Sequence, residues 1–135
     1  MEIHKGRLLD HVHLRVADLE ASRRFYVAVT ESLGIPVGFS TESAFSIDEL
    51  FVSDDGEATA RVHVAFQAAD EAAVQRFHEA GLGAGGTDNG RPGPRDYHPG
   101  YYAAYLLDPD GNNVEAVFHG PADRSAPSVV FTTPG

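Results

Sequence analysis

The sequence contains no cysteine, which excludes disulfide bonds and thiolate chemistry in this chain. Any metal site must therefore use His, Asp, Glu, backbone or water as ligands, so its donors are nitrogen and oxygen. The sequence also lacks an apolar run of about eighteen residues, the length at which a membrane-spanning helix becomes a candidate. No secretory apolar segment precedes the first amphipathic stretch, so we expect a cytoplasmic protein.

Basic residues are few. Ten Lys and Arg residues stand against 20 Asp and Glu, which gives a formal net charge of -10 at pH 7. A chain this acidic repels phosphate backbones and anionic lipids, so the sequence predicts neither a nucleic-acid nor a membrane partner. Its 135 residues and 42% hydrophobic content suit one domain with a hydrophobic core.

An internal repeat at an offset of 52 residues organises the chain. His11 aligns with His63, and seven of the fifteen positions that start there are identical, where unrelated sequences share about one. The natural interpretation is a gene duplication. The alternative is chance similarity between two alanine-rich segments.

Each copy begins with a strand pattern of period two. In the first copy Val12, Leu14 and Val16 share one face, and the residues between them share the other. In the second copy, residues 61–67 alternate in the same way, with Val62, Val64 and Phe66 on one face. A helix that covers the apolar face would leave His11 and His63 on the opposite, concave face.

A helix follows each of these strands. Asp18 and Asp70 stand where N-caps are expected, because their carboxylates can accept from free N–H groups of the first turn. The first apolar stripe runs from Leu19 and ends at Gly34. The second ends at Gly81, which predicts a helix shorter by about one turn.

Short strand-like segments follow each helix, so that each copy reads as a βαβββ unit. They cover residues 37–40 and 45–52 in the first copy, and 101–107 and 114–118 in the second. The sequence Asp108-Pro109-Asp110-Gly111 predicts a tight turn between the last two strands. Five glycines and three prolines predict a long loop over residues 85–100.

We therefore predict an α+β fold with one domain over residues 1–120. It is built from units 8–57 and 58–119, with a tail at 121–135. Within the tail, Ser128 to Thr132 could add an edge strand to this chain or to a neighbouring one.

The alternation on the last strand places Glu115 on the same face as the two aligned histidines. Two imidazoles and one carboxylate, His11, His63 and Glu115, form a facial triad with open coordination positions. Such a site suits one divalent ion of Fe, Mn, Ni, Co or Zn. The alternative for each residue alone is an ordinary polar side chain on a strand.

Three segments resemble the vicinal-oxygen-chelate superfamily, which includes glyoxalases, bleomycin resistance proteins and extradiol dioxygenases. They are residues 10–26, residues 62–66 and the run from Leu107 to Glu115. The resemblance covers about residues 8–119. It implies paired βαβββ units that form a half-barrel of mixed sheet around the metal, with helices on the outer face, commonly in a homodimer.

Two finer resemblances point to different reactions. Arg15 matches an arginine that glyoxalase I uses to hold the glutathione part of its substrate, and glyoxalase I usually has a fourth, glutamate ligand, for which Glu49 or Asp48 is the nearby candidate. A second set of residues nearly matches the ring-cleavage signature of extradiol dioxygenases: His98, Tyr105, Pro109, Gly111 and Glu115. The difference is Ala104, where that signature has a bulky aliphatic residue.

Further side chains are candidates for the reaction. Tyr105 lies across the predicted hairpin from Glu115, where its phenol could donate to a substrate oxygen. His98 is suited to proton transfer. Arg15, Arg95 and Tyr101 are candidates for substrate binding, and the arginines would attract an anionic group. The alternatives are a half-buried tyrosine and solvated loop residues; we interpret His4, His78 and His119 as structural or exposed.

The resemblance thus implies a metal-dependent enzyme for a small vicinally oxygenated substrate, either lyase- or isomerase-like or dioxygenase-like. The alternative is a binding protein that sequesters a drug or metabolite without catalysis, as bleomycin-resistance relatives do. Those relatives generally lack the ligand triad. The presence of all three residues therefore favours catalysis.

Overall fold

The computed structural model describes residues 2–5, 7–123 and 129–132, and these form two helices and three sheets. The first unit consists of β2 (Val12–Arg15), α1 (Leu19–Ser32), β3 (Ala44–Ile47) and β4 (Leu50–Ser53). The second consists of β5 (His63–Gln67), α2 (Glu71–Gly83), β6 (Thr87–Pro94), β7 (Tyr102–Leu107) and β8 (Asn113–Phe118). Neither helix in the described part of the chain is long and apolar enough to cross a membrane.

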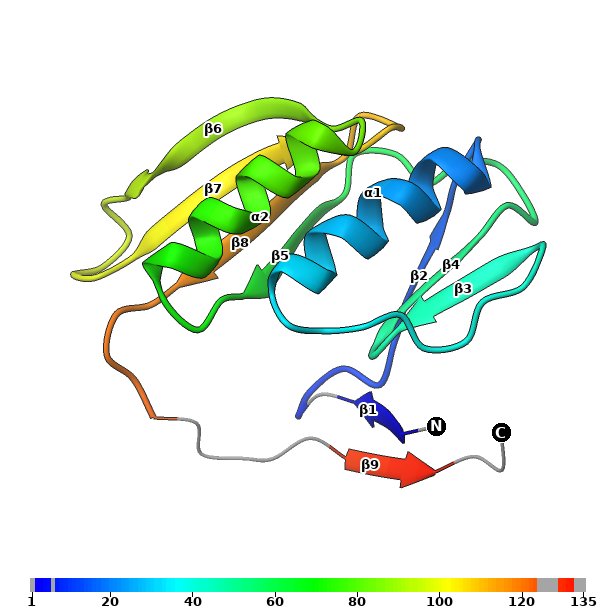
Figure 1. The fold of residues 1–135 in the computed structure, drawn as a ribbon, viewed down its shortest axis with the longest axis horizontal. Helices are drawn as coiled ribbons and strands as arrows, with labels where there is room; N and C mark the ends of the chain where they lie inside the picture. The colour runs from blue at the N-terminus through cyan, green and yellow to red at the C-terminus, as the bar shows by residue number, and fades with distance from the viewer. Residues whose placement is uncertain (1, 6, 124–128, 133–135) are drawn as a thin grey trace.

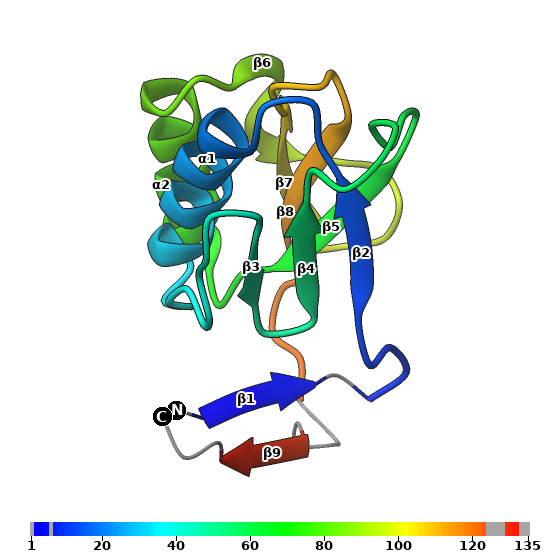
Figure 2. The same cartoon turned by 90° about the vertical axis from the view of Figure 1, so that its right-hand side faces the viewer.

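The two helices lie side by side and cover one side of the main sheets (Figure 1). Figure 2 shows the same layers edge-on, with α1 and α2 on one side and the strands on the other. The sheet of the first unit has the order β2-β4-β3, and that of the second has the order β5-β8-β7-β6. Each contains parallel and antiparallel pairs, so the predicted α+β fold of two mixed-sheet units with outer helices is confirmed.

The repeat extends to the register of the strands. In the first unit β2 is parallel to β4, with Val12 opposite Leu50, and in the second β5 is parallel to β8, with Val64 opposite Val114. Because an offset of 52 aligns Val12 with Val64, the two parallel pairs occupy equivalent positions. The aligned segments therefore have the same fold as well as similar sequences.

The predicted faces of the first strands are confirmed. Leu14 and Val16 are buried at 2% exposure, whereas Arg15 between them is exposed. On β5, His63 is exposed and Val64 is half-buried. The apolar side chains of both strands pack into the core under the helices. The largest fully buried side chains of this core come from α1, α2 and β3, and they are Phe25, Tyr26, Phe77 and Phe45.

Three predictions for the later strands are wrong. Residues 45–52 form two strands, because the chain turns back at Asp48, which has a φ of 47°. Residues 37–40 contribute an isolated bridge, Ser40 to Phe45, in place of a strand. Thr87–Pro94, predicted as loop, is β6; its glycines and prolines are tolerated because β6 lies at the edge of its sheet and shifts register around Gly90.

The helix caps are confirmed, but the predicted end of α2 is wrong. Asp18 accepts from the N–H of Ala21 at 3.1 Å, and Asp70 accepts from that of Ala73 at 2.7 Å. α2 has 13 residues against 14 in α1 and continues through Gly81. A Cβ on Gly81 would lie 2.2 Å from Leu106 Cδ1. This glycine therefore allows α2 to pack closely on the sheet, and it does not end the helix.

The chain ends pair with each other. β1 (Glu2–Lys5) and β9 (Val129–Thr132) form an antiparallel two-stranded sheet, which lies below the main sheets in Figure 2. The edge strand predicted over Ser128–Thr132 thus pairs within this chain; Ser128 itself lies outside the described residues.

The buried carboxylate of Asp108 connects the β7–β8 turn to α1 through a hydrogen bond. Asp108 is 5% exposed, and its Oδ2 accepts from the hydroxyl of Tyr26 at 2.5 Å. Its Oδ1 accepts from the backbone N–H groups of Asp110 at 2.9 Å and Asn112 at 2.8 Å. The predicted turn is therefore confirmed, and it also joins the two units.

The same turn holds the segments that lead into α1 and β5. Asp110 Oδ1 accepts from the N–H of Ala17 at 3.3 Å. The side chain of Asn112 accepts from the N–H of Val62 at 3.0 Å and donates to the carbonyl of Thr59 at 3.1 Å. Residues 108–112 thus fix both strand-to-helix units relative to one another.

The position of Asp110 in this turn is unfavourable for the charged form of its carboxyl group. Its Oδ2 is buried and has no hydrogen-bond partner among the described residues. Burial first, and then the charges of Asp108 and Asp18, raise the pKa of Asp110 above its usual value. A carboxyl whose folded pKa is raised destabilises the fold when ionised, and that cost disappears as the pH falls below its unfolded pKa.

We therefore expect Asp110→Asn to stabilise the protein at pH 7, by no more than about 1 kcal/mol because solvent screens the charge. The amide oxygen can still accept from Ala17. Urea unfolding at pH 7 and pH 3 measures the gain, which should shrink at the lower pH. Asp54→Asn on an exposed loop is the control for net charge. A gain that is equal at both pH values, or a loss at pH 7, contradicts the expectation.

Candidate functional site

Strand pairing in the second sheet brings His63 and Glu115 together. β5 runs parallel to β8 with Ala65 opposite Glu115, so His63, two residues before Ala65, lies on the same face. His63 Nε2 is 2.7 Å from Glu115 Oε1. The predicted convergence of these two residues is therefore present in the structure.

Glu115 is a buried carboxylate, and each of its two oxygens has a hydrogen-bond partner. It is 2% exposed, and an ionised group at such a position needs hydrogen bonds or a charge partner. His63 donates to Oε1, and the hydroxyl of Tyr101 donates to Oε2. Tyr105 is directly opposite Glu115 on β7, as predicted, and its ring centroid is 6.1 Å from that of His63.

The phenol groups of Tyr101 and Tyr105 remain protonated at neutral pH. Burial first, and then the hydrogen bond and charge of Glu115, hold the pKa of Tyr101 well above its usual value. Burial and the charge of Glu115 also raise the pKa of Tyr105. Both hydroxyls are therefore hydrogen-bond donors beside a carboxylate.

Arg95 lies at this site, but its donors are engaged by the backbone. Its guanidinium carbon is 5.2 Å from the centroid of the Tyr105 ring. Nη1 donates to the carbonyl of Gly93 at 2.9 Å, and Nη2 donates to that of Arg91 at 2.8 Å. In this conformation Arg95 shapes the end of β6 and supports the Tyr105 ring.

His98 is near Tyr101, and both of its ring nitrogens have partners. Nδ1 is 2.9 Å from the carbonyl oxygen of Pro99, and Nε2 is 2.9 Å from Nδ1 of His119. The sequence indicates that His119 is structural or exposed, and in the structure it is exposed. Its alternation with Glu115 and Val117 was a signal for this face, but the contact with His98 depends on a loop conformation that no periodicity predicts.

A cavity of about 560 Å³ opens beside this group of residues. Its walls come from the start of α2, the end of β6 and the loop between β6 and β7. The lining includes Glu71, Arg95, Asp96, His98, Tyr101 and Tyr102.

His11 does not join His63 and Glu115. It precedes β2, which belongs to the other sheet, and its Nδ1 is 2.8 Å from Asp10 Oδ1. Within the described ranges, no group of three His, Asp or Glu side chains is placed to hold a metal ion. The structure therefore contains two of the three predicted donors as a pair, with the third apart from them.

Arg15 is also separate from this pair. Its Nε donates to Asp55 Oδ1 at 3.0 Å, and the same oxygen accepts from the hydroxyl of Ser53 at 2.8 Å. Ser53 Oγ is in turn 2.7 Å from His13 Nε2. The Ser53 hydrogen bond, and then Arg15, hold the pKa of Asp55 below its usual value. Arg15 thus forms an ion pair within the first unit.

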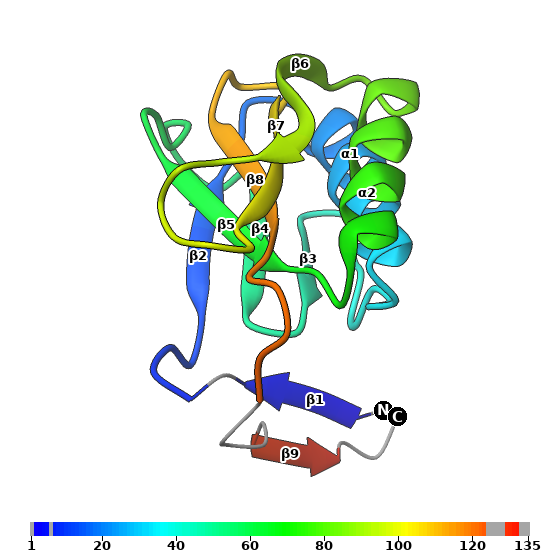
Figure 3. The same cartoon turned by 90° about the vertical axis from the view of Figure 1, so that its left-hand side faces the viewer.

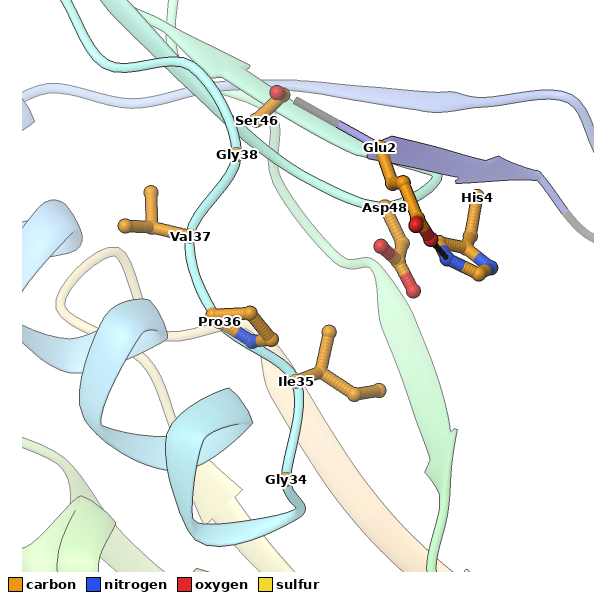
Figure 4. A pocket seen from close by; sticks show the side chains of 9 residues that line it. All are labelled: Glu2, His4, Gly34, Ile35, Pro36, Val37, Gly38, Ser46 and Asp48. Atoms are coloured by element: carbon orange, nitrogen blue, oxygen red, sulfur yellow. Dashed lines mark hydrogen bonds and ion pairs between the residues drawn. The ribbon is translucent and has the colours of Figure 1, made fainter. Parts of the chain in front are cut away.

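The register also bears on the predicted fourth ligand. Phe51 lies opposite His13, as Glu115 lies opposite Ala65, and the repeat aligns His13 with Ala65. Phe51 therefore occupies the position equivalent to Glu115 in the first unit. Asp48 points instead toward a cavity of about 490 Å³ that Glu2 and His4 also line (Figure 4). Glu49 follows Asp48, and its carbonyl accepts from the N–H of Val12 at 2.7 Å.

Known proteins share the sequence pattern and the fold of this chain. The Glyoxalase/Bleomycin resistance protein/Dioxygenase superfamily profile matches residues 8–116. A glyoxalase/bleomycin resistance protein from Albidiferax ferrireducens T118 is 34% identical with a TM-score of 0.73, and the match covers 82% of this chain and 98% of that one. No curated protein matches the sequence.

More distant structures share the fold. A glyoxalase-related enzyme from Fulvimarina pelagi is 23% identical with a TM-score of 0.66, over 94% of this chain and 99% of that one. Lactoylglutathione lyase from Agrobacterium tumefaciens is 21% identical with a TM-score of 0.61, over 83% and 93%. At these identities the similarity shows the fold alone.

The geometry predicts that the Tyr101 hydroxyl is needed to keep Glu115 buried. Tyr101→Phe removes the donor to Oε2 and should cost about 1–3 kcal/mol of unfolding free energy. Tyr102→Phe is the matched control, because that hydroxyl accepts a surface hydrogen bond from Gln75 at 3.0 Å and should cost about 0.5 kcal/mol or less. Urea unfolding at pH 7 compares the two variants, and equal losses would argue against a special role for Tyr101.

Proposed function

Because the chain belongs to the glyoxalase/bleomycin resistance protein/dioxygenase superfamily, we propose that it is a metal-dependent enzyme for a small molecule with two neighbouring oxygen atoms. The observation that carries the proposal is the buried carboxylate of Glu115, which is 2.7 Å from an exposed imidazole and beside two protonated phenols. A carboxylate buried at a sheet face among polar side chains is typical of a functional site.

His63 and Glu115 are suited to hold one divalent ion. Two donors bound to the same ion at about 2.0–2.2 Å, at roughly a right angle, lie about 3 Å apart. The 2.7 Å between His63 Nε2 and Glu115 Oε1 is close to that spacing. The ion would belong to the group Fe, Mn, Ni, Co and Zn, which accept imidazole with carboxylate.

His11 is the proposed third ligand, and it must reach the pair by one of two routes. The residues before it are exposed, with Leu8 at 90% and Leu9 at 52%, so core packing does not hold this segment. His11 therefore joins either through movement within the chain or from a second copy in a homodimer. Mixing His11→Ala chains with Glu115→Ala chains separates the two routes.

The side chains of the site have distinct proposed roles. A divalent ion bound there would act as a Lewis acid on two adjacent substrate oxygens. Tyr105, whose pKa is raised, would donate a hydrogen bond to a substrate oxygen as negative charge develops on it. Tyr101 holds the second oxygen of Glu115 and so fixes the direction of the first.

The geometry bears on the choice between reaction classes. Tyr105, which carries the resemblance to extradiol dioxygenases, is at the site opposite Glu115. Arg15, which carries the resemblance to glyoxalase I, is paired with Asp55 in the first unit. The residue typical of the dioxygenase-like class is therefore at the site within one chain, whereas Arg15 lies on β2 just after His11 and would reach the site together with it.

A binding protein that sequesters its ligand is the second candidate. The specific observation in its favour is that the described residues contain no three-donor metal group. In that case the cavity beside Tyr101 would bind a ligand, and substitutions at the site would change only its dissociation constant.

The proposal predicts that three alanine variants share one defect. His63→Ala, Glu115→Ala and His11→Ala should each weaken divalent-metal affinity about 10-fold or more, because each removes one ligand. Isothermal titration of the metal-free protein with Ni²⁺ or Zn²⁺ measures the affinity. His78→Ala is the control, since His78 of α2 pairs with Asp88 of β6, away from these ligands, and this variant should bind the metal as the wild type does.

Mixing His11→Ala with Glu115→Ala chains shows where His11 acts. If His11 comes from a second copy, each mixed dimer contains one complete site, and about a quarter of the sites regain affinity. If His11 acts within its own chain, no site recovers. Unchanged affinity in all three variants would contradict the proposal and favour the binding protein.

A further inference from the structure

The 95–101 loop, which joins β6 to β7, closes against the end of β8 through a pair of histidines. Figure 3 shows this connection sweeping out beside β5 and returning to β7. His98 from the loop is 2.9 Å from His119, measured from Nε2 to Nδ1. The two rings are stacked, with centroids 5.1 Å apart and planes inclined by 17°.

Beside this histidine pair, two glycines allow the backbone of the loop to approach the backbone that follows β8. Gly100 and Gly120 have φ values of 89° and 84°, in the left-handed region. A Cβ on Gly100 would lie 3.1 Å from the carbonyl oxygen of His119 and 3.2 Å from Gly120 Cα. Asp96, Tyr97 and His98 are exposed, so core packing does not hold this part of the loop. The backbone approach and the histidine pair are two of the contacts that hold it against the end of β8.

The closed loop positions Tyr101. The ring of Tyr101 lies 5.4 Å from each imidazole, and its hydroxyl donates to Glu115. The N–H of Tyr101 donates to the carbonyl of His98 at 3.1 Å, and that of Arg95 donates to the carbonyl of Tyr101 at 2.9 Å. The contact between His98 and His119 is therefore linked to the contact between Tyr101 and Glu115.

Hydrogen-bond chemistry limits how many protons the pair can hold. A carbonyl oxygen only accepts, so His98 Nδ1, which faces Pro99 O at 2.9 Å, carries a proton. Neutral His98 then accepts at Nε2 from the Nδ1–H of His119. One added proton on His98 is tolerated if His119 moves its own proton to Nε2. With two added protons both facing nitrogens are donors, and the bond cannot form.

We propose that His98 and His119 form a pH-sensitive latch that holds Tyr101 on Glu115 and opens when both imidazoles are protonated. His119 is then a positioning residue, which acts on the site through His98 and the loop. The inference rests on the proposed function only in taking Glu115 as a site residue.

Other titratable groups lie near the histidine pair. Tyr101 lies between the rings and the sheet, and Tyr97 contacts Tyr101 with ring centroids 4.9 Å apart. Charged and titratable groups also line the cavity next to His98. These groups are Glu71 of α2, Arg95 and Asp96 of the loop, and Tyr102 of β7.

Amide hydrogen exchange of the metal-free protein between pH 8 and pH 5 tests the latch, since histidine changes charge in this range. The probes are the amides of Tyr101 and Arg95, corrected for intrinsic exchange rates. Opening takes up one proton, so their protection should fall about 10-fold per pH unit once the second proton binds. The amide of Ala104, inside β7, is the control and should keep its protection.

Two variants at position 119 separate the latch from general loosening. In His119→Asn the amide can donate to neutral His98 or accept from protonated His98, so protection at Tyr101 should be high and independent of pH. In His119→Ala it should be low throughout. Protection at Tyr101 that does not change with pH in the wild type, or that changes equally in His119→Asn, would overturn the proposal.

Failure of the latch and failure of the proposed function give different results. The exchange experiment uses neither metal nor substrate, so its outcome does not depend on catalysis. A chain that binds no metal but shows the pH-dependent protection keeps the latch and loses the proposed function. A chain that binds the metal but whose amide protection at Tyr101 does not change with pH keeps the proposed function and loses the latch.

Discussion

The structure depends on the buried carboxylate of Asp108. A buried carboxylate is stable only with its lone pairs satisfied, and Asp108 accepts from Tyr26 of α1 and from two backbone N–H groups of its own turn. These bonds set the turn between β7 and β8, and the turn sets the register that places Tyr105 opposite Glu115. A contact that joins the first unit to the second thus also aligns Glu115 of β8, seven residues after Asp108 in the chain.

The two units share a scaffold, but the site belongs to the second. His63, Tyr101, Tyr105 and Glu115 all come from the second unit, where the sheet has four strands. The equivalent of Glu115 in the first unit is Phe51, whose ring contacts His13 edge-on with centroids 4.7 Å apart. The two units therefore share a parallel strand pair but carry different side chains at the equivalent position, Phe51 in the first and Glu115 in the second. This asymmetry agrees with one site per chain.

Local patterns in the sequence predicted what depends on local chemistry. Alternation predicted that Leu14 and Val16 are buried, and the positions of Asp18 and Asp70 predicted both helix starts, because caps and strand faces are set within a few residues. The strand β6 and the interior position of Gly81 were missed, because a sheet edge and a close packing contact depend on distant parts of the chain. Alternation also predicted that His63 and Glu115 share a face. It could not predict whether His11 meets them, since that depends on how two separate sheets are placed.

The central claim is that His63 and Glu115 are two ligands of one divalent ion. The most direct measurement is a crystal structure of the protein grown with Ni²⁺ or Zn²⁺, with anomalous diffraction recorded at the absorption edge of that metal. We expect one strong anomalous peak per chain, about 2.0–2.2 Å from both His63 Nε2 and a carboxylate oxygen of Glu115. A bound ion elsewhere, with the 2.7 Å contact between His63 and Glu115 intact, would contradict it.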